Sequence, residues 1–187
     1  MSENNPPVST GRGDDGTTTL LGSGRMSKTD LRIVVLGDLD EASSFLGLAR
    51  AEAVEEVGTL LLEMQRLLYR VMGDVAMPKE DNFVGASDLK FVEDALEEWR
   101  GRTEIPKEFI IPGETRLGAQ LDVARSVVRR AERSLVAAGY AEARAGENTP
   151  PASATAHPDA GRVVNRLSDL LFVVARAADG KKTLSRG

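Results

Sequence analysis

Residues 115–138 read TRLGAQLDVARSVVRRAERSLVAA, and this stretch decides the fold class. Its apolar side chains recur at alternating spacings of four and three residues: Leu117, Leu121, Ala124, Val128, Ala131, Leu135 and Ala138. In an α-helix this spacing gathers them on one side, and a heptad seam kept for three repeats is typical of a helix that packs nearly in line with its neighbours. The stretch therefore predicts a long helix in a helical bundle.

The same period recurs in four other segments, at about residues 38–49, 56–76, 87–101 and 159–178. Asp38 with Glu41 resembles a capping box that starts the first segment, and Ser87 is a suitable N-cap for the third. Pro78 ends the second. No stretch alternates as a strand would over a useful length. The prediction is an all-α antiparallel bundle of four long helices and a shorter one, of the ferritin-like or four-helix-bundle type.

Composition excludes several classes of protein. The 187 residues include 29 acidic and 24 basic side chains, so the formal charge is −5, which argues against a nucleic-acid partner. The absence of cysteine excludes disulfides and thiolate metal sites, and a single histidine, His157, excludes a multi-histidine centre. No apolar run is long enough to span a membrane, and the N-terminus has no secretory pattern, so a cytoplasmic protein is expected.

The chain divides into three parts by composition. Residues 1–29 are rich in glycine, serine and threonine, and form either a disordered tail or a loop ordered by what it binds. Residues 30–180 form the bundle, in which residues 139–158 are expected to be an exposed crossover loop that holds His157 at the surface. Residues 181–187 form a C-terminal tail.

The glycine-rich segment GRGDDGTTTLLGSGR, residues 11–25, has the chemistry of a phosphate site. Gly13 and Gly16 let backbone amides approach an anion, the hydroxyls of Thr17 and Thr18 can donate, and Arg25 and Lys28 supply positive charge. The spacing is not that of a Walker A loop, and no strand precedes it. A low-complexity tail explains the composition equally well.

Two helices carry a polar stripe beside their apolar face. In the helix from residue 115, Arg125, Arg129 and Glu132 recur at i, i+4 and i+7, with Arg130 and Arg133 beside them. This pattern fits either a solvated face with ion pairs or an anion clamp, because the arginine fork meets phosphate oxygens in pairs.

The last helix repeats the pattern away from its apolar face, with Asn165, Asp169, Phe172 and Arg176. By pattern alone, both the apolar run that starts at Phe109 and the single tryptophan, Trp99, are interpreted as core packing.

Four segments in a fixed order carry a resemblance: GDDGTTTLL (13–21), RMSKTDLRIVVLGDLDEASSFLGLA (25–49), FIIPGETRLGAQLDVARSVVRRAERS (109–134) and VVNRLSDLLFVVAR (163–176). In combination they resemble the PduO-type ATP:cob(I)alamin adenosyltransferases. The resemblance implies a five-helix bundle that forms a homotrimer with active sites between subunits. It implies transfer of the 5′-deoxyadenosyl group of ATP to cob(I)alamin or a related cob(I) corrinoid, with release of triphosphate. The Co(I) centre is then the nucleophile, so the protein needs no catalytic base.

The same resemblance assigns roles to single residues. Phe109 and Phe172 lie against the cobalamin, where Phe109 disfavours a lower axial ligand and makes reduction of Co(II) accessible. Arg125 and Asp40 form an ion pair across the subunit interface, and Glu132 acts at the magnesium–nucleotide site. The residues expected at ATP are Gly13, Asp14, Gly16, Thr17, Thr18, Arg25, Lys28, Arg125, Arg129, Glu132 and Asn165. The other candidate partners are a cobalamin reductase and a B12-dependent client enzyme.

The chain departs from the family pattern at three places. It has Arg12-Gly13-Asp14-Asp15-Gly16 where Thr-Gly-Asp-Lys-Gly is usual, so a hydroxyl and a cation are replaced near the triphosphate. Ser43 replaces the usual Asn, and Glu114 replaces a Gly beside the expected corrinoid site. Weaker ATP binding or an altered corrinoid preference is expected. Two alternatives remain: a non-catalytic bundle that binds ATP or adenosylcobalamin as a chaperone or sensor, and a purely structural helical oligomer.

Overall fold

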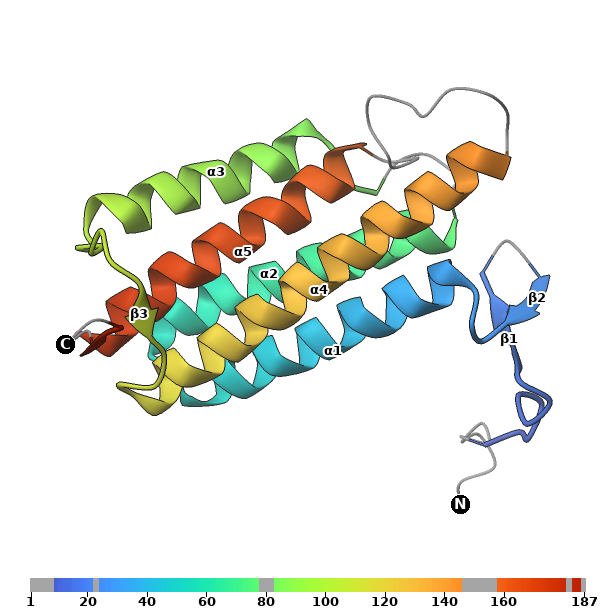
Figure 1. Ribbon diagram of the computed structural model, residues 1–187, viewed down its shortest axis with the longest axis horizontal. Coiled ribbons are helices and arrows are strands. Elements are labelled where there is room, and N and C mark those ends of the chain that lie inside the picture. Colours follow the sequence, from blue (N-terminus) through green and yellow to red (C-terminus); the bar gives the residue numbers. More distant parts are fainter. Residues whose placement is uncertain (1–8, 22–23, 78–82, 146–157, 181–182, 186–187) are drawn as a thin grey trace, which may run out of the picture.

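The computed structural model describes residues 9–21, 24–77, 83–145, 158–180 and 183–185. Five helices make up most of this part of the chain (Figure 1). Their bounds are α1 Leu31–Glu52, α2 Glu55–Ala76, α3 Ala86–Gly101, α4 Arg116–Ala145 and α5 Pro158–Asp179. Consecutive helices run in opposite directions, so the prediction of an antiparallel all-α bundle is confirmed.

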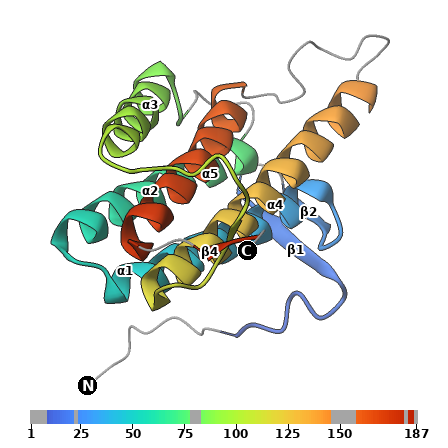
Figure 2. The same cartoon turned by 60° about the vertical axis from the view of Figure 1, so that its left-hand side comes forward.

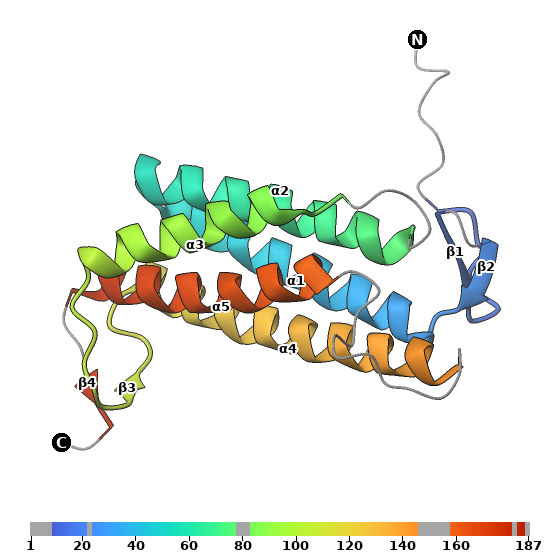
Figure 3. The ribbon, with the colours of Figure 1, turned by 90° about the horizontal axis from the view of Figure 1, so that it is seen from above.

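Helix α4 joins the α1–α2 pair to the α3–α5 pair. It contacts both α1 and α5, α2 packs on α1, and α3 packs on the outer side of α5 (Figure 2, Figure 3). The predicted heptad seam of α4 faces these neighbours: Leu121, Ala124, Val128, Ala131, Leu135 and Ala138 are all buried. Burial of each large apolar side chain contributes about 1.5–3 kcal/mol, so the seam drives the association of the helices.

Trp99 in α3 is also buried, as predicted, and the Arg102 guanidinium stacks 3.8 Å from the centre of its ring.

The first helix begins seven residues before the predicted start at Asp38, at Leu31. Its N-cap is Asp30, whose Oδ1 accepts a hydrogen bond from the backbone N–H of Arg32 at 3.0 Å. Asp38 does not cap a helix; it accepts a bond of 2.9 Å from Arg130 in α4. The prediction was wrong because the β-branched residues 33–35 do not favour a helix by themselves, whereas packing of Val35 in the core overrides that preference.

Two other boundaries differ from the prediction. Helix α3 begins at Ala86 with Gly85 as N-cap, and the Asp88 carboxylate accepts the Gly85 N–H at 3.0 Å, so Ser87 is not the cap. Helix α4 continues to Ala145, because alanine and glutamate after residue 139 favour a helix. The predicted loop therefore starts too early, and it also ends one residue late, since Pro158 is the first residue of α5. Residues 146–157, with His157, lie outside the described residues, as does Pro78.

Four short strands were not predicted. β1 (Thr17–Leu20) and β2 (Gly24–Ser27) form an antiparallel pair just before α1, within the segment predicted to be a tail or a loop. β3 (Ile110–Ile111) pairs with β4 (Thr183–Leu184), which belongs to the predicted C-terminal tail. The two pairs lie at opposite ends of the bundle (Figure 3). Strands this short carry too little alternation for a sequence pattern to detect.

Candidate active site

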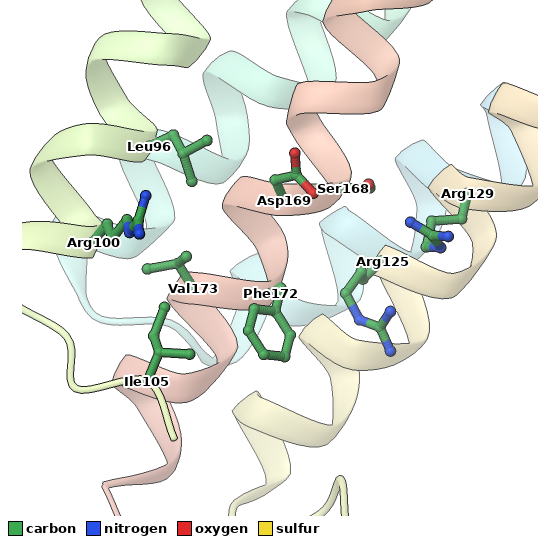
Figure 4. A pocket seen from close by; sticks show the side chains of 9 residues that line it. All are labelled: Leu96, Arg100, Ile105, Arg125, Arg129, Ser168, Asp169, Phe172 and Val173. Atoms are coloured by element: carbon green, nitrogen blue, oxygen red, sulfur yellow. The ribbon is translucent and has the colours of Figure 1, made fainter. Parts of the chain in front are cut away.

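Two hollows lie side by side where α3, α4 and α5 meet the segment before β3. One, of about 420 Å³, is the arginine pocket, lined by Leu96, Arg100, Ile105, Arg125, Arg129, Ser168, Asp169, Phe172 and Val173 (Figure 4). The other, of about 520 Å³, is the Phe109 pocket, lined by residues 105–110, Pro112, Asp122, Arg125, Phe172 and Arg176. The two hollows share Ile105, Arg125 and Phe172 in their linings. Two ligands bound in them would therefore lie next to each other.

The arginine pocket is lined by three arginines and one carboxylate, Asp169, so its lining is positive in net charge. Arg125 and Arg129 reach into it from α4 and Arg100 from α3 (Figure 4). Arg129 and Arg100 are exposed, and within the described residues neither forms an ion pair with a carboxylate. Asp169, also at the pocket, lies 3.6 Å from Arg166. Two free guanidinium groups facing one hollow suit a ligand with several anionic oxygens.

The Phe109 pocket presents an apolar side chain that the bundle does not use. Phe109 is 87% exposed, so the interpretation of this residue as core packing is wrong. Its backbone is nevertheless fixed, because β3 pairs with β4 and the Phe109 carbonyl accepts the Ser185 N–H at 2.8 Å. A large ring held in an exposed position at a hollow suits a flat apolar ligand face.

Below the Phe109 pocket lies a buried ionic network. Arg176 is 1% exposed and contacts the carboxylates of Asp122 and, at 2.9 Å, Asp179. Its guanidinium also lies 5.4 Å from the centre of the Phe172 ring. The prediction that Arg176 lies away from the apolar face is therefore wrong, because paired carboxylates allow it to be buried.

The two predicted polar stripes meet between α4 and α5. Asn165 Nδ2 donates to Glu132 Oε1 at 2.6 Å, and both side chains are half-buried. Arg125, also half-buried, donates through Nε to Asp122 Oδ1 at 3.0 Å. Of the residues beside the stripe, Arg133 binds the Arg129 carbonyl at 3.0 Å.

Arg130 lies on the α1 side of this stripe. It pairs with Asp38 and Glu41, and the hydrogen bond to Asp38 raises the pKa of its guanidinium. The solvated-face interpretation fits Arg133, which is exposed, whereas Arg130 forms ion pairs with another helix, α1, which neither interpretation predicted.

The N-terminal segment forms a compact turn around its glycines. The Asp14 N–H donates to the Gly11 carbonyl and the Gly16 N–H to the Gly13 carbonyl, each at 3.2 Å. Gly16 has φ +78°, a conformation that favours glycine. A Cβ at Gly13 would lie 3.1 Å from Lys28 Nζ, so Lys28 lies directly over this turn.

Asp15, one of the departures from the family pattern, binds the neighbouring hydroxyl and cation. It accepts bonds from the backbone N–H and the hydroxyl of Thr17, at 3.0 and 2.7 Å, and pairs with Arg25 at 2.9 Å. The Thr17 hydrogen bonds lower the pKa of the Asp15 carboxyl. Asp15 thus engages Arg25 and Thr17, two residues expected to contact phosphate.

The chain alone does not bring all candidate residues together. The hairpin with Gly13, Thr18 and Lys28 lies beyond the start of α1, at the end of the bundle opposite β3 and the Phe109 pocket (Figure 1). Asp40 is exposed on α1, and Arg125 pairs with Asp122 rather than with Asp40. No group of three or more His, Asp or Glu side chains is placed to hold a metal ion within the described residues.

Comparison with known proteins decides the family. A family model described as cobalamin adenosyltransferase matches residues 8–178. The chain belongs to this family. The resemblance predicted from the four sequence segments is therefore confirmed.

Relatives of this cobalamin adenosyltransferase include a protein named cobalamin adenosyltransferase from Cupriavidus metallidurans, 39% identical over 90% of this chain and 86% of that protein. A corrinoid adenosyltransferase from Citrobacter freundii is 34% identical over 90% and 93% of the two chains.

Solved structures of PduO-type adenosyltransferase variants from Lactobacillus reuteri superpose with a TM-score of 0.78. One, complexed with ATP, is 29% identical and covers 96% of this chain and 100% of its own. Another, complexed with cobalamin and ATP, is 28% identical and covers 97% and 100%. None of the described helices of this family member is long and apolar enough to cross a membrane.

Several site residues escaped sequence reasoning. Arg100 and Ile105 come from α3 and the loop after it, and no spacing rule connects them with α4. Asp179 is an i, i+3 neighbour of Arg176 on α5, but Asp122 reaches Arg176 only through the packing of α4 on α5. One available signal was the spacing Asp122–Arg125, an i, i+3 pair beside the apolar seam.

Proposed function

We propose that this cobalamin adenosyltransferase transfers the 5′-deoxyadenosyl group of ATP to the cobalt of cob(I)alamin and releases triphosphate. One observation carries the proposal. A pocket with free arginines adjoins a pocket with an exposed phenylalanine, in a chain whose structural neighbour is complexed with ATP and cobalamin. An anionic and a flat apolar substrate would meet at the shared wall formed by Arg125 and Phe172.

The reaction balances without a protein nucleophile or base. The Co(I) electron pair attacks C5′ of ATP, the cobalt–carbon bond forms, and the C5′–oxygen bond breaks with its electrons going to triphosphate. The protein must then bind two substrates in line, stabilise the charge on the leaving group and exclude water. The free arginines of the arginine pocket fit the second task.

Phosphate binding is proposed for residues of two copies of the chain. Arg129, which pairs with no carboxylate of the described residues, and Arg125 would bind triphosphate oxygens, while Asn165 would hold the nucleotide. The neighbouring copy would wrap the triphosphate with its N-terminal turn. The residues of this copy that take part are Gly13, Asp14, Gly16, Thr17, Thr18, Arg25 and Lys28. Residues 1–29 thus act as an ATP-binding segment, residues 30–180 as the adenosyltransferase domain and residues 181–187 as a tail.

Magnesium is proposed to enter with ATP. Mg²⁺ is usually held by one or two carboxylates and the substrate phosphates rather than by a full protein cage. Glu132 suits this role, since its Oε1 accepts the Asn165 hydrogen bond and, among the described residues, its Oε2 forms no hydrogen bond or ion pair that would prevent coordination. The ion would neutralise part of the triphosphate charge.

The corrinoid is proposed to bind at the Phe109 pocket. Phe109 and Phe172 would contact the macrocycle, and Phe109 would occupy the lower side of cobalt, where it disfavours an axial ligand and eases reduction of Co(II). The 87% exposure of Phe109 supports this, because such a ring contributes little to the core. A cobalamin reductase would supply the electron, and a B12-dependent enzyme would use the product.

A homotrimer is proposed because one copy separates the parts of the site. The Arg125 side chain uses Nε for Asp122, which leaves its two terminal nitrogens for Asp40 of a neighbouring copy. The adjoining helices α1 and α4 also expose Leu31, Val34, Leu48, Val123 and Val136. Size-exclusion chromatography with light scattering should give a molar mass three times the 20.1 kDa mass of the chain. A monomer at micromolar concentration would contradict the trimer.

Turnover tests the proposal directly. Purified protein is mixed anaerobically with ATP, magnesium and chemically reduced cobalamin, and the corrinoid absorption is followed. Appearance of the adenosylcobalamin spectrum supports the proposal. ATP binding by calorimetry without turnover would instead favour a chaperone or sensor, and no nucleotide binding would favour a structural oligomer.

A further inference from the structure

Asp122 binds two arginines at once, one in each direction. Its Oδ1 accepts from Arg125 Nε at 3.0 Å, and its Oδ2 accepts from Arg176 Nη2. Asp122 is 4% exposed, so the carboxylate lies in the core beneath the Phe109 pocket. One of its arginines is almost completely buried and the other lines both pockets.

The charges of this network balance only when Arg125 is included. Arg176 lies between Asp122 and Asp179, and all three are buried, which gives two negative charges and one positive. An uncompensated buried charge is costly. Arg125 supplies the second positive charge, so electrostatics hold its side chain against Asp122.

This contact also determines how Arg125 presents its guanidinium. With Nε bound to Asp122, the planar group is fixed in orientation and Nη1 and Nη2 extend away from the carboxylate. The described residues offer these two nitrogens no carboxylate partner. An arginine held at Nε is pre-organised to bind a further group through its terminal nitrogens.

We propose that Asp122 is a positioning residue of the adenosyl transfer, which acts by holding Arg125 at the wall between the two pockets. Asp122 is itself held by Arg176, which also binds Asp179. Asp179 is fixed because it accepts hydrogen bonds from the N–H and the hydroxyl of Thr115, at 3.3 and 3.2 Å. The proposal rests on the proposed function, since Arg125 acts there on ATP.

A double-mutant cycle between Asp122 and Arg125 tests it. The variants are Asp122→Leu, Arg125→Ala and the double variant, measured with ATP and pre-reduced cobalamin. Asp122→Leu leaves the buried Arg176–Asp179 pair intact, so the charges below the pocket still balance. Thermal unfolding identifies any variant that has lost its structure. If Asp122→Leu does so, Asp122→Ala, which also removes the acceptor for Arg125 Nε, takes its place in the cycle.

We expect Asp122→Leu to lower kcat/KM for ATP by about 10-fold, as its coupling to one charged contact implies, and to have no further effect when Arg125 is already Ala. Asp94→Leu, at an exposed carboxylate paired with Lys90, should leave kcat/KM unchanged. If Asp122→Leu lowered kcat/KM by the same factor with and without Arg125, or did not lower it at all, the positioning role would be overturned. If the wild-type protein does not catalyse the reaction, the proposed function fails. ATP affinities measured for the same variants then still decide whether Asp122 acts through Arg125.

Discussion

Asn165 in α5 donates to Glu132 in α4 at 2.6 Å, and this bond between residues 33 positions apart joins the polar stripes of the two helices. It uses one oxygen of the Glu132 carboxylate and fixes the direction of the other. The contact brings the Asn165 amide of α5 against the α4 stripe that carries Glu132, Arg125 and Arg129, where the nucleotide is proposed to bind.

Replacing Glu132 by Gln should weaken the magnesium site without disturbing the fold. Gln keeps an oxygen that can accept from Asn165 but loses the negative charge that attracts Mg²⁺. The Mg²⁺ concentration for half-maximal activity should rise several-fold in a titration at fixed ATP, while the unfolding temperature stays the same. Glu63→Gln, an exposed carboxylate in α2, is the matched control. An unchanged Mg²⁺ requirement would exclude Glu132 from the metal site.

Arg129→Ala should raise the KM for ATP. Arg129 has no carboxylate partner within the described residues, so its removal costs the fold little but deletes a charge-assisted contact of ~1.5–3 kcal/mol, equivalent to roughly 10- to 150-fold. Steady-state kinetics with ATP as the varied substrate measures this. Arg66→Ala, another exposed arginine, serves as control. A KM equal to that of the wild type would mean that Arg129 only faces solvent.

Phe109→Ala should slow the reaction that starts from Co(II) more than the reaction that starts from pre-reduced Co(I). The reason is that Phe109 is proposed to disfavour the lower axial ligand, which matters for reduction. Because the ring is 87% exposed, the free energy of unfolding should change by less than about 0.5 kcal/mol. Equal slowing from both starting states would indicate that Phe109 only shapes the pocket.

Gly118→Ala should destabilise the protein. An added Cβ would overlap Asp179 Oδ1 and lie 2.7 Å from the Asp179 carboxyl carbon. That carboxylate is buried and bound to Arg176 and Thr115, so it cannot move freely, and overpacking of this kind costs about 1–3 kcal/mol. Denaturant unfolding measures the loss. Gly101→Ala, where a Cβ meets nothing within 4 Å, should not destabilise, and equal stability of the two variants would contradict the close packing at Gly118.

Thr17→Val should raise the pKa of the Asp15 carboxyl toward its ordinary value, because the Thr17 hydroxyl bond is the largest cause of the lowered pKa. A group with a lowered folded pKa stabilises its turn above the ordinary pKa, and that stabilisation is lost as pH falls through the folded pKa. The wild-type turn should therefore persist to lower pH than the turn of the variant. Carboxyl-carbon NMR titration of labelled aspartate follows this, and identical Asp15 titrations would exclude the hydrogen bond.

The bundle could be predicted because its cause is local. The α4 seam repeats over three heptads, and every residue of the seam from Leu121 onward is buried. Helix starts were less predictable: Asp38 and Glu41 have the spacing of a capping box, yet in the structure they neutralise Arg130, a residue 92 positions away from Asp38. Sequence spacing cannot distinguish a capping carboxylate from one that pairs with another helix.

The site could be predicted only in part, for a similar reason. The stripe Arg125, Arg129 and Glu132 follows from helical spacing alone. The burial of Arg176 does not, since it depends on Asp122 and Asp179 on either side of it. Phe109 was expected in the core by its apolar neighbours, whereas pairing of β3 with β4 keeps its ring outside.

In the proposed reaction, cobalt attacks C5′ of ATP and expels triphosphate in one step. The most direct test is the stoichiometry of a single anaerobic turnover, with adenosylcobalamin measured by absorption and inorganic triphosphate by ion chromatography. We expect one triphosphate for each adenosylcobalamin, and a parallel loss of both products in Arg129→Ala. Adenosylcobalamin without an equal amount of triphosphate, or ATP consumed with no cobalt–carbon bond formed, would contradict it.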